Sequence, residues 1–198
     1  MKRLAVIVGR FQTYSIEEHL GYNDILIKNA LELASSILFI ICSSQLIDKR
    51  NPLNFKTRKH MIEGYFIDSD RICNLSGVEN IDDVGDDESW SSILDSMIIT
   101  HCDKFGICLQ DTILVGSRDS FLYTYMGAID YHVIDSTINF SSSKMRADIV
   151  ANFNNHEFYI GFYKALSLVY YLTDPVTYLL KTSDERKGFI FFINLYYK

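Results

Sequence analysis

A short apolar run that ends in a glycine turn constrains this chain more than any other feature. Residues 4–8 are all apolar, and a turn with the sequence Gly-Arg-Phe-Gln follows at residues 9–12. An apolar segment with helical spacing then opens near residues 19–22 and continues to about Ala34. A buried strand, a glycine turn and a helix start in succession favour phosphate binding, because the first helical turn offers unpaired N–H groups and a partial positive charge.

The overall composition excludes several classes of protein. The 198 residues are 48% hydrophobic and 22% charged, which is typical of a folded domain and not of a disordered chain. The net charge of −6 provides no basic field for a general nucleic-acid binder, so no nucleic-acid partner is expected. No window reaches the roughly 18 uncharged residues of a membrane-spanning helix, so no membrane partner is expected either.

The cysteines favour a reduced, cytoplasmic setting. None of the four (Cys42, Cys73, Cys102 and Cys108) has CxxC spacing, and three lie in or beside apolar runs, where cysteine behaves as a small hydrophobic residue. A metal-thiolate site is disfavoured because a fourth ligand at zinc spacing is missing. The N-terminal apolar run stops at Val8 and is too short for a signal peptide.

Strand and helix patterns alternate along the first 150 residues. Further strands are predicted at 36–42, 71–75, 111–116 and 131–135, and helices at 55–66, with Asn54 as N-cap, and at 90–104. The near-continuous apolar run at 36–42 is typical of a strand buried on both faces. The pattern predicts a doubly wound, Rossmann-like parallel α/β sheet over residues 1–150. Residues 151–198 are predicted to form a helical C-terminal extension packed on the same domain.

Polar turns follow four of the predicted strands. They lie at residues 9–12, 43–45, 116–119 and 141–146, where the last combines three serines with Lys144 and Arg146 at a helix start. Ligands of doubly wound sheets bind beyond the carboxyl ends of the strands. The four turns are therefore predicted to form one site.

Several of these motifs together resemble the nucleotidyltransferase superfamily that carries a His-x-Gly-His signature. The turn at 9–12 with His19-Leu20-Gly21 provides the general likeness. Three further motifs narrow this likeness to one branch of the superfamily. They are Asn51-Pro52-x-x-Phe55-x-x-Arg58, Asp83 seven residues before Trp90, and the Ser-Ser-Lys-Met-Arg sequence at 142–146. With these, residues 1–150 resemble nicotinamide-nucleotide adenylyltransferases of the archaeal-type and Nudix-fused branch, although no Nudix signature is present.

The resemblance implies adenylyl transfer from ATP, with Mg²⁺, to nicotinamide mononucleotide, giving NAD and pyrophosphate. It implies catalytic roles for His19, Tyr22 and Arg146, and ATP contacts from Gly9, Arg10, Phe11, Gly21, Ser142, Ser143 and Lys144. It implies that Ser43, Gln45, Asp83 and Trp90 contact the mononucleotide, and that Arg58 and Arg118 are further candidates for binding phosphate. No protein ligand for the metal is implied.

One position departs from the family pattern, and alternatives stay open. Tyr22 stands where the second signature histidine belongs, and its hydroxyl can donate a hydrogen bond but carries no positive charge near neutral pH. Tyr22 indicates a slower enzyme, an enzyme with a rearranged site, or a nucleotide-binding sensor without chemistry. Separately, a related nucleotidyltransferase with another phosphate acceptor stays open. For Trp90, a structural role as a core anchor of its helix is about as well supported as a contact with the mononucleotide. The aromatic stripe within 156–172 favours core or subunit packing, which leaves a homo-oligomer open.

Overall fold

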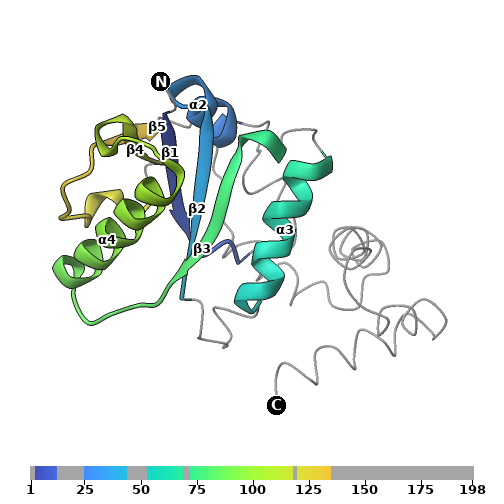
Figure 1. Ribbon diagram of the computed structural model, residues 1–198. Coiled ribbons are helices and arrows are strands. Elements are labelled where there is room, and N and C mark those ends of the chain that lie inside the picture. Colours follow the sequence, from blue (N-terminus) through green and yellow to red (C-terminus); the bar gives the residue numbers. More distant parts are fainter. Residues whose placement is uncertain (1–2, 13–24, 44–52, 69–71, 118–119, 135–198) are drawn as a thin grey trace, which may run out of the picture.

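Five parallel strands form the central sheet of the computed structural model (Figure 1). The structure describes residues 3–12, 25–43, 53–68, 72–117 and 120–134. The strands are β1 (Leu4–Gly9), β2 (Ser36–Cys42), β3 (Leu75–Ile81), β4 (Thr112–Ser117) and β5 (Tyr131–Ile134), in the spatial order β3-β2-β1-β4-β5. This order confirms the predicted doubly wound, Rossmann-like α/β fold.

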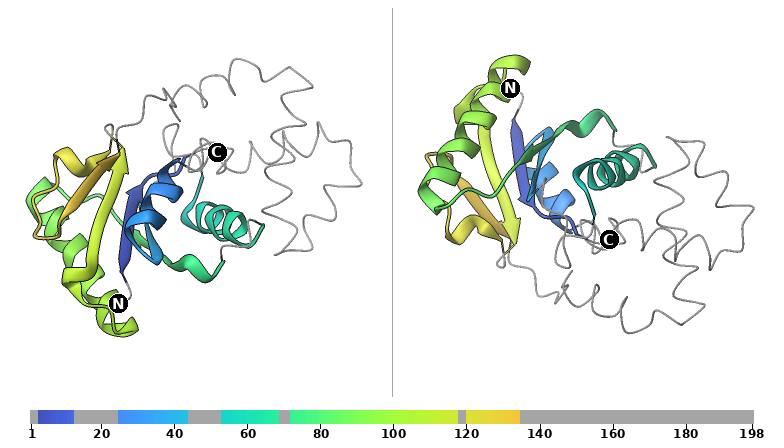
Figure 2. Two further views of the ribbon diagram at one scale, coloured as in Figure 1. Left: turned by 90° about the horizontal axis from the view of Figure 1, so that it is seen from above. Right: turned by 90° about the horizontal axis from the view of Figure 1, so that it is seen from below.

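Helices cover both faces of the sheet. Helices α2 (Ile25–Leu33) and α3 (Phe55–Asp68) lie on one face, and α4 (Asp87–Phe105) lies on the other, as the two views of Figure 2 show. Side chains of β1 alternate between the two layers, because successive residues of a strand point to opposite faces. Ala5 and Ile7 join the core cluster with α2 and α3, whereas Val6 and Val8 join the cluster with α4. All of these positions are buried, which explains why the sequence of β1 is apolar without a polar alternation.

Most predicted elements are found close to their predicted bounds. β2 has the predicted bounds 36–42, and α3 begins at the predicted residue 55. Asn54 caps α3 as predicted, with its Oδ1 accepting a hydrogen bond of 2.8 Å from the backbone N–H of Thr57. Helix α4 begins three residues before Trp90, because Asp86 is its N-cap and accepts from the N–H of Ser89.

The predicted third strand at 71–75 is wrong. Residues 72–74 form a 3-10 helix, and β3 begins only at Leu75 and continues to Ile81. The sequence of β3, Leu-Ser-Gly-Val-Glu-Asn-Ile, lacks an apolar run because β3 is an edge strand with only two buried positions. An edge strand needs fewer buried side chains than a central one, so its signal in the sequence is weak.

The order of the strands places a topological switch between β1 and β4. The chain passes from β1 outward through β2 to β3, and then crosses to β4 on the other side of β1. Since all pairings are parallel, the carboxyl ends of the strands share one edge of the sheet, the lower edge for β1, β2 and β3 in Figure 1. This edge is where ligands bind in folds of this kind.

Part of the predicted architecture lies outside the described residues. This applies to the helix start at 141–146 and to the C-terminal extension at 151–198, so the division at residue 150 stays a prediction. Within the described helices, none combines the length and the apolar character needed to cross a membrane. All four cysteines are described, and each is a free thiol.

Candidate functional site

The turn after β1 carries one exposed cation above a buried aromatic ring. The side chain of Arg10 is exposed, whereas the ring of Phe11 is 2% exposed and packs edge-on against Phe39 with 5.7 Å between ring centroids. A Cβ atom at Gly9 would lie only 3.2 Å from Cζ of Phe11, so glycine leaves room for this ring. Phe11 thus packs against the core, and its predicted contact with ATP stays a prediction.

Ser43 and Asp83 join the ends of β2 and β3. The hydroxyl of Ser43 donates a hydrogen bond of 2.6 Å to Oδ2 of Asp83, although 40 residues separate them in the chain. Ser43 is 2% exposed, whereas Asp83 is exposed. The two residues were both predicted to contact the mononucleotide, and the structure brings them together with the carboxylate facing solvent.

Two residues of these loops have left-handed backbones. Phe11 has φ of 47° and Ser43 has φ of 51°, and they are the only non-glycine residues with positive φ in the described part of the chain. The left-handed region of φ and ψ is sterically unfavourable for residues with a Cβ atom. Both lie at the carboxyl ends of neighbouring strands, and unusual backbone geometry of this kind often accompanies functional loops.

Arg58 does not have the exposed position expected of a phosphate ligand. Its side chain is fully buried, and its guanidinium donates to three loop carbonyls: Arg10 at 2.7 Å and Cys42 at 2.8 Å from Nη1, and Ser43 at 3.0 Å from Nη2. Nε donates to the carbonyl of Asn54 at 3.3 Å. The geometry assigns this side chain to the loop backbones in place of the phosphate contact considered for it.

Charged groups surround the end of β2. Burial, with a smaller contribution from the carboxylate of Asp83, raises the pKa of the Cys42 thiol to about 12 against the opposing effect of the Arg10 and Arg58 cations. Burial also lowers the pKa of Arg58 to about 10, so its guanidinium stays protonated at neutral pH. The thiol is therefore neutral, and two cations and one carboxylate gather at this edge of the sheet.

Gln12 fixes the first turn to the entry of α3. Its Nε2 donates to the carbonyl of Leu53 at 2.9 Å, and its Oε1 accepts from the N–H of Leu53 at 2.9 Å. This reciprocal pair spans 41 residues of sequence and satisfies both backbone groups of Leu53. Sequence reasoning used Gln12 only as part of the motif, and no local pattern indicates its partner.

Trp90 lies in the first turn of α4 and is partly buried. Its ring packs edge-on against Phe121, with 5.2 Å between centroids, and borders the core cluster under α4. Phe121 also packs against Tyr125. The observed contacts correspond to the core-anchor interpretation of Trp90, while its stacking on a nicotinamide ring stays a prediction.

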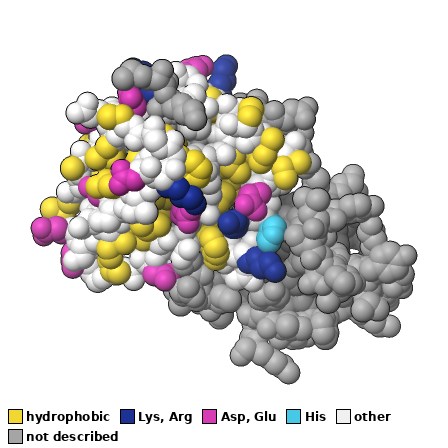
Figure 3. All heavy atoms as spheres, viewed as in Figure 1, with side chains coloured by type: hydrophobic (Ala, Val, Ile, Leu, Met, Phe, Trp, Pro, Cys, Tyr) yellow, Lys and Arg dark blue, Asp and Glu magenta, His cyan; other side chains and the backbone are white. Residues whose placement is uncertain are grey.

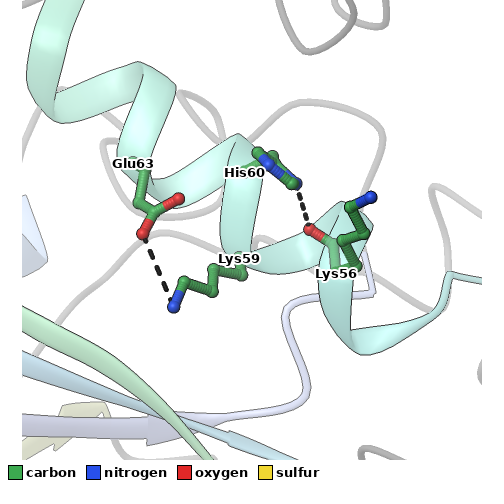
Figure 4. Close-up of polar contacts among 4 residues, drawn as sticks. All are labelled: Lys56, Lys59, His60 and Glu63. Atoms are coloured by element: carbon green, nitrogen blue, oxygen red, sulfur yellow. Dashed lines mark hydrogen bonds and ion pairs between the residues drawn. The ribbon is translucent and has the colours of Figure 1, made fainter. Parts of the chain in front are cut away.

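The exposed side of α3 carries basic side chains that are independent of the site. Side chains coloured as lysine or arginine and one coloured as histidine gather over this helix in Figure 3, and the basic residues at the surface of α3 include Lys56 and Lys59. Figure 4 shows that Lys59 pairs with Glu63 at 3.8 Å and that Nδ1 of His60 lies 2.7 Å from the carbonyl of Lys56. These contacts join residues four apart within one helix, so Lys59 is a surface cation adjacent in sequence to the buried Arg58.

The remaining predicted site residues lie outside the described residues. They are His19, Gly21, Tyr22, Gln45, Arg118, Ser142, Ser143, Lys144 and Arg146. Their roles stay predictions. Of the predicted set, the structure thus brings together Gly9, Arg10, Ser43 and Asp83 at one edge.

Similarity to known proteins is confined to solved structures. No protein-family model and no curated protein sequence matches the chain. The solved structures that match its fold include NadR protein in complex with NAD and AMP-PNP, with a TM-score of 0.52, and NadR protein in complex with NR, with a TM-score of 0.51. Both are 13% identical to this chain and cover 80% and 79% of it. The chain spans less than half of either (44% and 43%), and at this identity the match supports the fold alone.

Proposed function

We propose that this chain is a nucleotidyltransferase that transfers the adenylyl group of ATP to nicotinamide mononucleotide, giving NAD and pyrophosphate. The observation that carries the proposal is the gathering of Arg10, Ser43 and Asp83 at the carboxyl edge of the sheet, where β1, β2 and β3 end. A nucleotide-binding role is in keeping with this fold and with the ligands named for the two NadR structures.

The proposed reaction requires positioning more than covalent help from the protein. A phosphate oxygen of the mononucleotide attacks the α-phosphorus of ATP, a new P–O bond forms, and the bond from the α-phosphorus to the bridging oxygen of pyrophosphate breaks. Protein groups contribute by holding the two phosphates in line and by stabilising charge on the leaving group. Arg10 is the described cation exposed for this task, and His19 and Arg146 are the further predicted ones.

Mg²⁺ is proposed to enter with ATP. Within the described part of the chain, no group of three histidine, cysteine, aspartate or glutamate side chains is arranged to hold a metal ion. The phosphates of ATP supply oxygen ligands that suit Mg²⁺. When bound there, the ion neutralises phosphate charge.

On the acceptor side, Asp83 is proposed to accept hydrogen bonds from the nicotinamide carboxamide. A carboxylate is an acceptor, and the carboxamide NH₂ supplies two donors. Its hydrogen bond from Ser43 fixes one oxygen and leaves acceptor capacity on the exposed side chain. Trp90 is proposed to stack on the nicotinamide ring from the first turn of α4.

A direct assay tests the proposal. The protein is incubated with ATP, nicotinamide mononucleotide and Mg²⁺, and NAD is measured by its enzymatic reduction to NADH. We expect NAD to accumulate with equimolar pyrophosphate, and to fall sharply in Arg10→Ala and Asp83→Ala. No NAD above background, together with no heat of binding for either nucleotide in calorimetry, would refute the proposal.

A second candidate function follows from Tyr22. Because tyrosine supplies no cation where the signature has histidine, a sensor that binds the same nucleotides without turning them over is the alternative. Loss of one donor in such a site costs on the order of 10²–10³ in rate. Binding without turnover in the native protein, with turnover gained in Tyr22→His, would favour the sensor; a fall in turnover in Tyr22→His would identify Tyr22 as an adapted catalytic residue.

A further inference from the structure

Arg58 directs its hydrogen bonds to the backbones of two separate loops. Its guanidinium donates to the carbonyl of Arg10 after β1 and to the carbonyls of Cys42 and Ser43 at the end of β2. The helix that carries it, α3, is itself fixed to the first of these loops through Gln12 and Leu53. One side chain therefore joins the carboxyl ends of two neighbouring strands.

The environment of Arg58 is an unusual one for a cation. The side chain has no exposed surface, and among the described residues no carboxylate lies within ion-pair distance of it. Burial without a counter-ion disfavours the charged form, and an apolar side chain at such a place is often no less stabilising. What an apolar side chain cannot provide is several donors in a rigid plane that reach different carbonyls together.

The carbonyls that Arg58 binds flank the two left-handed residues. The carbonyl of Arg10 precedes Phe11 directly, and Ser43 supplies its own carbonyl. A left-handed backbone at a residue with a Cβ atom persists only where its surroundings hold it. The same hydrogen bonds therefore determine the direction in which Arg10 leaves β1 and the position from which Ser43 reaches Asp83.

We propose that Arg58 is a positioning residue that fixes the two substrate loops relative to each other, without touching either substrate. This inference rests on the proposed function, in which the loop after β1 serves ATP and the end of β2 serves the mononucleotide. It predicts that one substitution at Arg58 weakens the binding of both nucleotides. Gln12, which holds only the first loop, should affect ATP alone.

Four variants separate positioning from charge and from folding. Arg58→Lys keeps a cation but cannot donate in a plane to three carbonyls; Arg58→Gln keeps donors without charge. Gln12→Ala releases one loop, and Lys59→Met removes a surface cation next to Arg58 in sequence as the matched control. Calorimetry measures the dissociation constants of ATP and nicotinamide mononucleotide for each, after urea unfolding has confirmed a folded population.

We expect Arg58→Lys and Arg58→Gln to raise both dissociation constants by about tenfold or more, the effect of losing at least one hydrogen bond to a charged group. Gln12→Ala should raise only that of ATP, and Lys59→Met should change neither. An unchanged pair of dissociation constants in folded Arg58→Lys would overturn the proposal. Failure of both Arg58 variants to fold would overturn it too, because the role would then be one of stability.

Amide hydrogen exchange gives a second readout that needs no ligand. If Arg58 fixes the loops, exchange at Phe11, Gln12 and Ser43 should quicken in Arg58→Lys and stay unchanged in Lys59→Met. Should the wild-type protein bind neither nucleotide, the proposed function fails, yet this exchange still decides the role of Arg58. Unchanged exchange in both loops would contradict it.

Discussion

The left-handed backbone at Ser43 predicts an inverted order of stability between two substitutions. Ser43 has φ of 51° and donates to Asp83 at 2.6 Å. Ser43→Ala and Ser43→Gly both remove the hydroxyl, so the hydrogen bond is lost equally in both. They differ in the Cβ atom, which alanine retains in a conformation where it is strained and glycine lacks.

The size of the difference follows from two opposing terms. A left-handed conformation costs a residue with a Cβ atom about 1–2 kcal/mol, which glycine avoids. Glycine in turn lowers the free energy of unfolding by about 0.4–1 kcal/mol relative to alanine, because the unfolded chain with glycine has more conformational freedom. We therefore expect Ser43→Gly to be more stable than Ser43→Ala by about 0.5–1 kcal/mol. With an m-value of about 2 kcal/mol/M, this is a difference of about 0.2–0.5 M in the urea midpoint.

Urea unfolding at 25 °C, followed by tryptophan fluorescence, measures the difference. Ser36, at the start of β2, is the matched control, because its backbone is not left-handed and its hydroxyl also donates a hydrogen bond, in this case to the carbonyl of Arg3. At Ser36 the usual order of stability applies, and the free energy of unfolding of Ser36→Ala should exceed that of Ser36→Gly by about 0.5–1 kcal/mol. Equal or higher stability of Ser43→Ala than of Ser43→Gly would refute the left-handed assignment and the role given to the surrounding hydrogen bonds.

Three further predictions test the neighbouring parts of the structure. Phe11→Leu should lower the free energy of unfolding by about 1–2 kcal/mol, because an aromatic pair and some buried area are lost, and should leave ATP affinity unchanged in calorimetry; a tenfold loss of affinity would show that the ring contacts ligand. Trp90→Ala should weaken mononucleotide binding severalfold and leave ATP affinity nearly intact if the ring stacks on nicotinamide; equal loss for both ligands would favour the packing role. Burial lowers the pKa of His101, whose Nε2 lies 2.7 Å from the hydroxyl of Ser76. The unfolded chain therefore takes up the proton first, and urea midpoints should be constant above about pH 6.5 and fall below it, a slope that His101→Phe should reduce.

The central part of the fold could be predicted from local patterns alone. β1 and β2 are buried on both faces, so their apolar runs are typical of central parallel strands, and the N-cap Asn54 has a local mechanism that can be recognised without the structure. β3 was misplaced because an edge strand is only partly buried, and the apolar residues just before it form a 3-10 helix. Local pattern is thus informative where burial is complete.

The candidate site was predictable only in part, for a related reason. Ser43 and Asp83 could be expected at the same edge, since parallel strands share that edge, and the structure joins them directly. The role of Arg58 could not be predicted, because an arginine on a helix is ordinarily solvated and nothing nearby in sequence indicates that three loop carbonyls will surround it. The pairing of Gln12 with Leu53 is likewise a tertiary contact without a local signal.

The buried thiol of Cys42 makes this edge of the sheet chemically observable. A thiol with a pKa near 12 is almost entirely protonated at neutral pH, and only the thiolate is alkylated at an appreciable rate. Cys73 and Cys108 are exposed and should react first. The slower rate at which Cys42 is alkylated would then report how often the loops at this edge open. A bound nucleotide that holds these loops closed should lower that rate.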